Sequence, residues 1–229
     1  MSAPASTEAQ GQVRVRVWDL PTRLFHWGIV AAVGMAWWSI TVHDLTIHRT
    51  AGAVAAGLLA FRFWWGLFGG STARFSDFLR GPGAVARYAR GLFGKGEDHA
   101  LGHNPMGGWS VAALILALSL IVGFGLFAVD TDGLESGPLA SLVSFEQGRA
   151  ASHWHDLAFD ALKALVVLHL IAIAFYALVK RDNLVRPMVL GGRMAPAGTK
   201  GLQPARLWAL ASGLVLGAGV AILLIRMNG

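Results

Sequence analysis

Two histidines in the second half of the chain have a spacing that suits metal ligands on one helix. His155 and His169 are fourteen residues apart within residues 153–179, a long apolar stretch. At about 100° per residue, this separation is about 40° short of four whole turns, so both imidazoles leave a helix on nearly the same face, about 21 Å apart along its axis. One helix at this position could therefore ligate two metal centres at two depths.

The composition restricts the class of protein to which such a helix belongs. Of the 229 residues, 55% are hydrophobic and 14% are charged, and the apolar residues fall in runs too long for the core helices of a soluble domain. We therefore predict an integral membrane protein. The chain contains no cysteine, which excludes disulfides, thiolate catalysis, iron–sulfur clusters and cysteine-bound zinc. Any metal must be held mainly by histidines.

Five apolar runs are long enough to cross a bilayer, and the charges around them predict their orientation. The net charge is +6, and Lys and Arg cluster in the N-terminal segment and in residues 69–106 and 180–206. The positive-inside rule places these segments in the cytoplasm and the C-terminus outside, so the basic residues are a topology signal and nucleic acid is not an expected partner. The predicted spans are residues 22–42, 48–68, 107–129, 153–179 and 207–225, with a short interfacial helix near 82–93.

This orientation assigns a depth to each of four histidines. His48 and His155 begin the second and fourth spans at the outer side. His26 lies near the cytoplasmic start of the first span, and His169 lies about 21 Å below His155. The histidines therefore form an outer pair, His48 with His155, and an inner pair, His26 with His169.

The functional interpretation is that each pair supplies two axial imidazoles to one haem iron. A membrane interior penalises unpaired polar groups, so a histidine there usually binds a metal, carries protons or bonds another helix. Two separate two-histidine sites without cysteine suit bis-imidazole haem, whereas a tetrahedral zinc site needs ligands that converge on one point. The alternative is that the histidines are hydrogen-bonded packing residues.

Two basic residues lie inside apolar spans. Arg62 follows His48 by fourteen residues, so it faces the same side at the depth of the inner haem. We predict that it neutralises haem propionates, and the alternative is that it extends to the inner headgroups. Lys163 lies off the histidine face, and we expect an i, i+3 salt bridge with Asp160.

Three further histidines are assigned to solvated or interfacial positions. His43 lies in a short outer connection, and His99 lies in a basic inner loop. His153 is two residues from His155 and therefore points to the other side of the helix, although it is the substitute ligand if His155 does not bind.

Four parts of the chain carry a family resemblance. They are VRVWDLPTRLFHW at residues 15–27, HRTAGAVAAGLLAFRFWWGLFG at 48–69, GHNPMGGW at 102–109, and the two histidines of the fourth span. Over residues 13–192 the chain resembles the bacterial b-type di-haem cytochromes, which include the cytochrome b subunit of nickel–iron hydrogenases and the prokaryotic cytochrome b-561 group. The resemblance implies two b-type haems, and it places their axial ligands on His26, His48, His155 and His169.

The resemblance also implies a function in the bacterial inner membrane. Electrons would cross between the quinone pool and a periplasmic redox partner, such as a cytochrome c or a hydrogenase-like subunit, and the protein would be an electron-transfer subunit of a quinone-linked oxidoreductase. Two alternatives stay open: a stand-alone oxidoreductase of the superoxide oxidase or ferric reductase type, and a haem-free scaffold or transporter. The outer connections carry the acidic residues Asp130, Asp132, Glu135 and Glu146. They would suit a basic partner, although the charge asymmetry of membrane topology alone also accounts for acidic outer loops.

The quinone is assigned to the motif GHNPMGGW, where Asn104 could donate a hydrogen bond to a quinone carbonyl. The same residues also suit an ordinary turn that leads into a helix.

The predicted fold is an all-α membrane protein, a five-span transmembrane helical bundle. Its haem-binding core consists of spans 1, 2 and 4, with span 3 alongside. Residues 1–12 are expected to form a disordered tail, residues 13–192 the di-haem domain, and residues 193–229 a linker and the fifth span. The fifth span would pack at the edge of the bundle or against another subunit in an oligomer, through close contacts at Gly213, Gly217 and Gly219.

Overall fold

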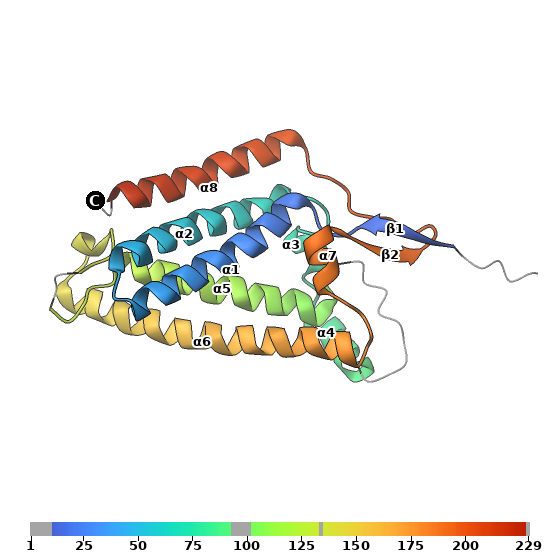
Figure 1. The fold of residues 1–229 in the computed structure, drawn as a ribbon, viewed down its shortest axis with the longest axis horizontal. Helices are drawn as coiled ribbons and strands as arrows, with labels where there is room; N and C mark the ends of the chain where they lie inside the picture. Colours follow the sequence, from blue (N-terminus) through green and yellow to red (C-terminus); the bar gives the residue numbers. More distant parts are fainter. Residues whose placement is uncertain (1–10, 93–101, 133–134, 228–229) are drawn as a thin grey trace, which may run out of the picture.

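The structure is a computed structural model that describes residues 11–92, 102–132 and 135–227, and it is almost entirely helical (Figure 1). Five of its helices are long and apolar enough to cross a membrane, which confirms the predicted five-span bundle. These five are α1 (Leu20–Thr41), α2 (Leu45–Phe68), α5 (Pro105–Phe127), α6 (Phe145–Leu178) and α8 (Leu207–Met227). The shorter helices are α3 (Phe75–Phe78), α4 (Pro82–Gly91), η1 (Ala140–Leu142) and α7 (Val185–Leu190).

Polar caps place the helix starts earlier than hydropathy predicts. The side chain of Asp44 accepts the backbone N–H of Ile47 at 2.9 Å, so α2 begins three residues before the predicted start. Ser144 and Gln147 form a capping box, and α6 begins eight residues early. Asn104 caps α5 in the same way. Hydropathy locates the apolar part of a span, whereas these caps determine where the helix begins.

Helix α2 lies at the centre of the bundle. Helices α1, α5 and α8 all pack against it, and α6 packs along α5 on the far side from α8 (Figure 1). The most apolar part of α2 is 56% buried, compared with 6% for α6. Protein therefore encloses α2 on most sides, whereas α6 lies at the edge of the bundle.

The fifth span is held against α2 by close contacts at glycine. A Cβ atom on Gly217 would lie 2.8 Å from the carbonyl oxygen of Gly57, and one on Gly213 would lie 2.7 Å from Cδ1 of Trp64. A Cβ atom on Gly219 would meet nothing within 4 Å. Of the three predicted glycines, two therefore form the helix contact and Gly219 does not.

We name the ends of the bundle after two histidines: α1 ends and α2 begins at the His48 end, and α1 begins and α2 ends at the His26 end. A two-stranded antiparallel sheet stands at the His26 end (Figure 1). Strand β1 (Gln12–Arg16) pairs with β2 (Gly192–Pro196), in a register that sets Val15 opposite Arg193. The sheet adds a small β element to the all-helical prediction, and the predicted domain boundary between residues 192 and 193 falls inside β2.

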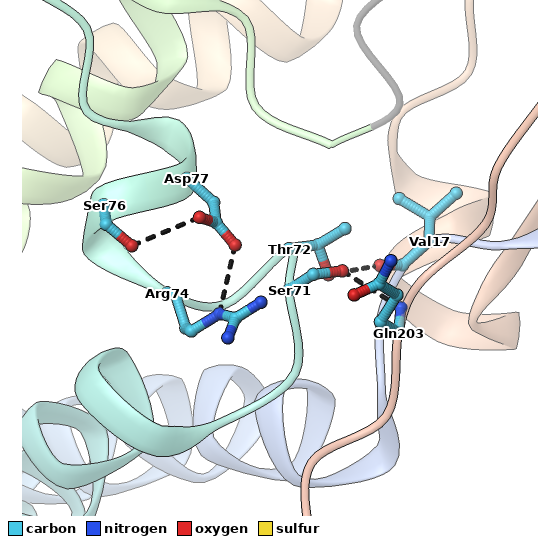
Figure 2. Close-up of polar contacts among 7 residues, drawn as sticks. All are labelled: Val17, Ser71, Thr72, Arg74, Ser76, Asp77 and Gln203. Carbon is cyan, nitrogen blue, oxygen red and sulfur yellow. Dashed lines mark hydrogen bonds and ion pairs between the residues drawn. The ribbon is translucent and has the colours of Figure 1, made fainter.

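Three segments that are remote in the sequence are tied together beside this sheet (Figure 2). The hydroxyl of Thr72 donates to the carbonyl of Val17 at 2.6 Å. The backbone N–H of Ser71 donates to the carbonyl of Gln203, and the N–H of Gln203 donates to the Ser71 hydroxyl, each at 3.0 Å. These bonds join the end of the N-terminal strand, the turn after α2 and the segment that leads to α8.

Replacing Gly217 with leucine is expected to separate α8 from α2. The new side chain would overlap the α2 backbone, and overpacking of this kind typically costs about 1–3 kcal/mol. Thermal denaturation in detergent, followed by circular dichroism, should show a lower melting temperature for Gly217→Leu. Gly219→Leu, two residues away on an open face, is the matched control and should melt like the parent. Equal melting temperatures for the two variants would contradict the packing described here.

Candidate functional site

The imidazoles of His48 and His155 face each other across a cavity at the His48 end. Their ring centroids are 5.9 Å apart, and their planes are inclined at 70°. Nδ1 of His48 lies 2.9 Å from the carbonyl oxygen of Ala36, and Nδ1 of His155 lies 2.8 Å from that of Ile121. A carbonyl oxygen can only accept, so each Nδ1 carries the hydrogen and each Nε2 keeps its lone pair.

This geometry suits one metal ion held by two imidazoles. An imidazole nitrogen binds a metal at about 2 Å and the ring centroid lies about 1 Å behind it, so two rings on opposite sides of one ion have centroids about 6 Å apart. The second nitrogen of a metal-bound histidine commonly donates to a carbonyl or carboxylate, which fixes the tautomer and the ring orientation. Both features are present in this pair.

The cavity between these histidines has room for a flat, mostly apolar cofactor. Its volume is about 370 Å³, and α1, α2, α5 and α6 all contribute to its wall. This volume lies within the range of about 300–1,000 Å³ that is usual for ligand pockets. Gly52 and Gly125 line it beside the histidines, and a Cβ atom on Gly125 would come within 3.1 Å of the His155 ring. Gly125 therefore leaves this ring room that a side chain would reduce.

A second cluster gathers at the His26 end. His26 and His169 lie close enough to interact electrostatically, and His103 interacts in the same way with Arg62 and His169. Among the described residues, no hydrogen-bond partner reaches the buried Nδ1 atoms of His26 and His103 or the buried Nη1 of Arg62. Buried polar atoms are nearly always paired, so several unpaired ones in one cluster are what a site for a polar or charged group would show.

Arg62 is the most deeply buried charged residue of this cluster, with 3% exposure. Its guanidinium carbon lies 4.8 Å from the ring centroid of Phe75 and 5.9 Å from those of Phe25 and Phe78. Asp19 interacts with it electrostatically, but this carboxylate accepts its hydrogen bonds from other residues. The side chain is therefore buried among aromatic rings, and one of its donors has no partner among the described residues and could bind an anion.

His103 is a member of the cluster that the sequence analysis did not single out. Its ring lies between those of Trp18 and Phe78, at centroid distances of 4.7 and 4.8 Å. Burial, with smaller contributions from Arg62 and His169, lowers the pKa of His103 to about 3, so its imidazole is neutral. Its position in the GHNPMGGW motif, directly before Asn104, was the signal in the sequence.

Asn104 uses both ends of its amide at the start of α5. Its Oδ1 accepts the N–H of Gly107 at 2.8 Å, and its Nδ2 donates to the hydroxyl of Tyr176 at 2.6 Å. That hydroxyl also bonds the hydroxyl of Tyr88 on α4. The structure thus contains the helix-starting turn expected as the alternative, and it also places an amide donor beside the end of α6.

The other singled-out residues lie away from both clusters. His43 and His153 are exposed, and His99 falls outside the described residues. Lys163 forms the predicted salt bridge with Asp160, at 2.7 Å. Within the ranges that the structure describes, no three His, Asp or Glu side chains are grouped so that they could hold a metal ion.

Comparison with known proteins identifies the family. The family model described as prokaryotic cytochrome b561 matches residues 17–191. The chain is also 24% identical over 217 residues to the "Probable Ni/Fe-hydrogenase B-type cytochrome subunit" of Azotobacter chroococcum mcd 1, over 80% of this chain and 90% of that protein. No solved structure matches. The chain therefore belongs to the prokaryotic cytochrome b561 family, and it is a multi-pass membrane b-type cytochrome of electron transfer.

Proposed function

We propose that this cytochrome transfers electrons across the bacterial inner membrane, between the quinone pool and a periplasmic redox partner, through two b-type haems. His48 and His155 hold one haem, and His26 and His169 hold the other. The facing His48–His155 pair carries the proposal, because both Nδ1 atoms are bonded to carbonyls and both Nε2 atoms keep their lone pairs. When bound, haem b supplies an iron that accepts and releases one electron.

The two sites are stacked because two helices each contribute to both of them. Helix α6 carries His155 and His169, and α2 carries His48 and Arg62. Both separations are fourteen residues, or about 21 Å along a helix. Two sites at these depths replace one long electron-transfer distance across the apolar layer with shorter ones.

Arg62 has a distinct role in this proposal. It supplies positive charge beside His103, which also interacts with His169, and its Nη1 atom, unpartnered among the described residues, is the donor for a haem propionate. A positive charge near a haem favours the reduced form, because reduction removes one positive charge from the iron. Arg62 therefore sets the potential of the inner site as well as binding the cofactor.

The two ends of the bundle supply the contacts with electron donors and acceptors. At the His26 end, Asn104 is the proposed donor to a quinone carbonyl, through the amide nitrogen that also donates to the Tyr176 hydroxyl. The basic residues at this end support a cytoplasmic location by the positive-inside rule, which leaves the C-terminus in the periplasm. At the His48 end, Glu135 is bound to Arg49 at 2.8 Å, whereas Asp132 and Glu146 are exposed to a partner. The related hydrogenase b-type subunit supports a hydrogenase-like protein as that partner.

Alanine variants of the four proposed ligands should lose haem in pairs. His48→Ala and His155→Ala are expected to abolish the same haem, and His26→Ala and His169→Ala the other, because a bis-imidazole site loses its cofactor with either ligand. Haem content per chain and reduced-minus-oxidised spectra of the purified variants measure this. His153→Ala, which changes an exposed histidine of α6, is the control and should keep both haems. The pairing is wrong if two members of a proposed pair affect different haems.

Removing the charge of Arg62 should lower the midpoint potential of the inner haem. We expect Arg62→Gln to shift it downward by the order of tens of millivolts, while Arg62→Lys, which keeps the charge, shifts it less. Redox titration followed in the haem absorption bands resolves the two sites. An unchanged potential in Arg62→Gln, with full haem content, would remove Arg62 from the propionate role.

The quinone assignment can be separated from the helix cap with an isosteric change. Asn104→Asp keeps a side-chain oxygen that caps α5 and removes the amide donor. The Tyr176 hydroxyl, which accepts from this amide in the parent, can donate to the new carboxylate instead. We expect this variant to keep its haem content and melting temperature. Its reduction by a quinol should be slower by up to about tenfold, which corresponds to the free energy of one lost hydrogen bond. Normal reduction kinetics in Asn104→Asp would leave Asn104 with the helix cap and the bond to Tyr176.

A further inference from the structure

An ion pair lies exposed on the outward face of α6. Nζ of Lys163 is 2.7 Å from Oδ1 of Asp160, and the two side chains are 49% and 67% exposed, respectively. The ammonium group also lies 5.2 Å from the ring centroid of Phe159. Val167, one turn farther along the helix, is 56% exposed on the same face.

This pair lies near the middle of the apolar layer. The hydroxyl of Ser152 donates to the carbonyl of Val129 at 2.6 Å, so Ser152 is level with the end of α5. Asp160 and Lys163 are eight and eleven residues farther along α6, or about 12 and 16 Å deeper. Helix α5 has 23 residues and is about 34 Å long, so the pair is close to halfway along it.

A half-exposed ion pair at this depth is unfavourable against lipid. Charged side chains near the middle of a bilayer normally face protein or water, and a salt bridge reduces this penalty without removing it. Lys163 is directed to Asp160, one turn toward the His48 end, and not to a headgroup. The His48–His155 cavity reaches the edge of this face, because Asp156 and Phe159 line it, but both side chains of the pair remain about half exposed or more. A polar partner is therefore expected from outside, on the face that carries this pair.

We propose that this face of α6, defined by Asp160, Lys163 and Val167, is the interface with a second copy of the chain. Asp160 and Lys163, an acid and a base side by side on this face, are self-complementary about a two-fold axis, and Asp156 adds a second exposed acid one turn nearer the His48 end. With both copies in the same orientation in the membrane, Asp160 reaches the partner's Lys163, and Lys163 reaches the partner's Asp160. The axial offset between them is about 4.5 Å, which a lysine side chain can span. This inference does not depend on the haem assignment.

The cysteine-free chain allows a direct test by crosslinking. Val167→Cys, oxidised in native membranes, is expected to give a disulfide-linked dimer, because facing cysteines with Cα atoms within about 4.4–6.8 Å can be bridged. Val215→Cys on α8, which is 73% exposed, is the matched control and should give no disulfide-linked dimer. The proposal is overturned if Val167→Cys forms no dimer, or if Val215→Cys forms one equally well.

A charge swap tests the electrostatic part of the interface. The double variant Asp160→Lys with Lys163→Asp keeps the pair within each chain and also keeps complementarity between two swapped chains. A mixed dimer of parent and swapped chains would instead set like charges against each other. Copurification of differently tagged parent and swapped chains should therefore show few mixed dimers, at most about one third of the number expected for random pairing. Statistical mixing, or a monomer in nanodiscs, would overturn the proposal.

Discussion

The hydrogen bonds from His48 and His155 to backbone carbonyls are the interactions on which the candidate site depends. His48 lies on α2 and bonds Ala36 of α1, while His155 lies on α6 and bonds Ile121 of α5. These bonds therefore join α2 to α1 and α6 to α5, and they set the tautomer of both rings. A carbonyl within a helix already accepts a backbone N–H, but its second lone pair remains available to an imidazole. Helix packing and ligand chemistry are thus determined by the same contacts.

The burial of α2 shows why the fifth span matters to this site. α2 carries His48 and Arg62, and α8 covers the side of α2 that α1 and α5 leave open. The contact of Gly217 with Gly57 brings the two backbones close together, and the indole N–H of Trp64 on α2 donates to the carbonyl of Ala209 on α8 at 2.9 Å. Close packing and an interhelical hydrogen bond both suit a helix in lipid. The fifth span therefore belongs to the packing that positions the helix on which His48 lies.

The sequence predicted the spans and the spacing of the histidines, because hydropathy and helical periodicity are local properties. The family resemblance read from its motifs is also confirmed, by the match over residues 17–191. The predicted starts of α2 and α6 lie too late in the sequence. Asp44 and Ser144 cap these helices, and a polar capping residue does not contribute to the hydropathy from which the spans were predicted. The pairing of β1 with β2, the aromatic enclosure of Arg62 and the burial of His103 depend on contacts between remote segments, which periodicity does not encode.

Polar groups inside the apolar layer separate into three kinds, and the difference indicates their roles. Nδ1 of His48 has a backbone partner, so its polarity is already satisfied and only Nε2 remains for a ligand. Nη1 of Arg62 is buried with no partner among the described residues, and an internal group of opposite charge is the simplest way to satisfy it. Lys163 is paired but exposed, so the free-energy cost of its charge against lipid can be lowered only by a group from outside the chain. The first two kinds indicate a site within the bundle, whereas the third indicates a neighbour in the membrane.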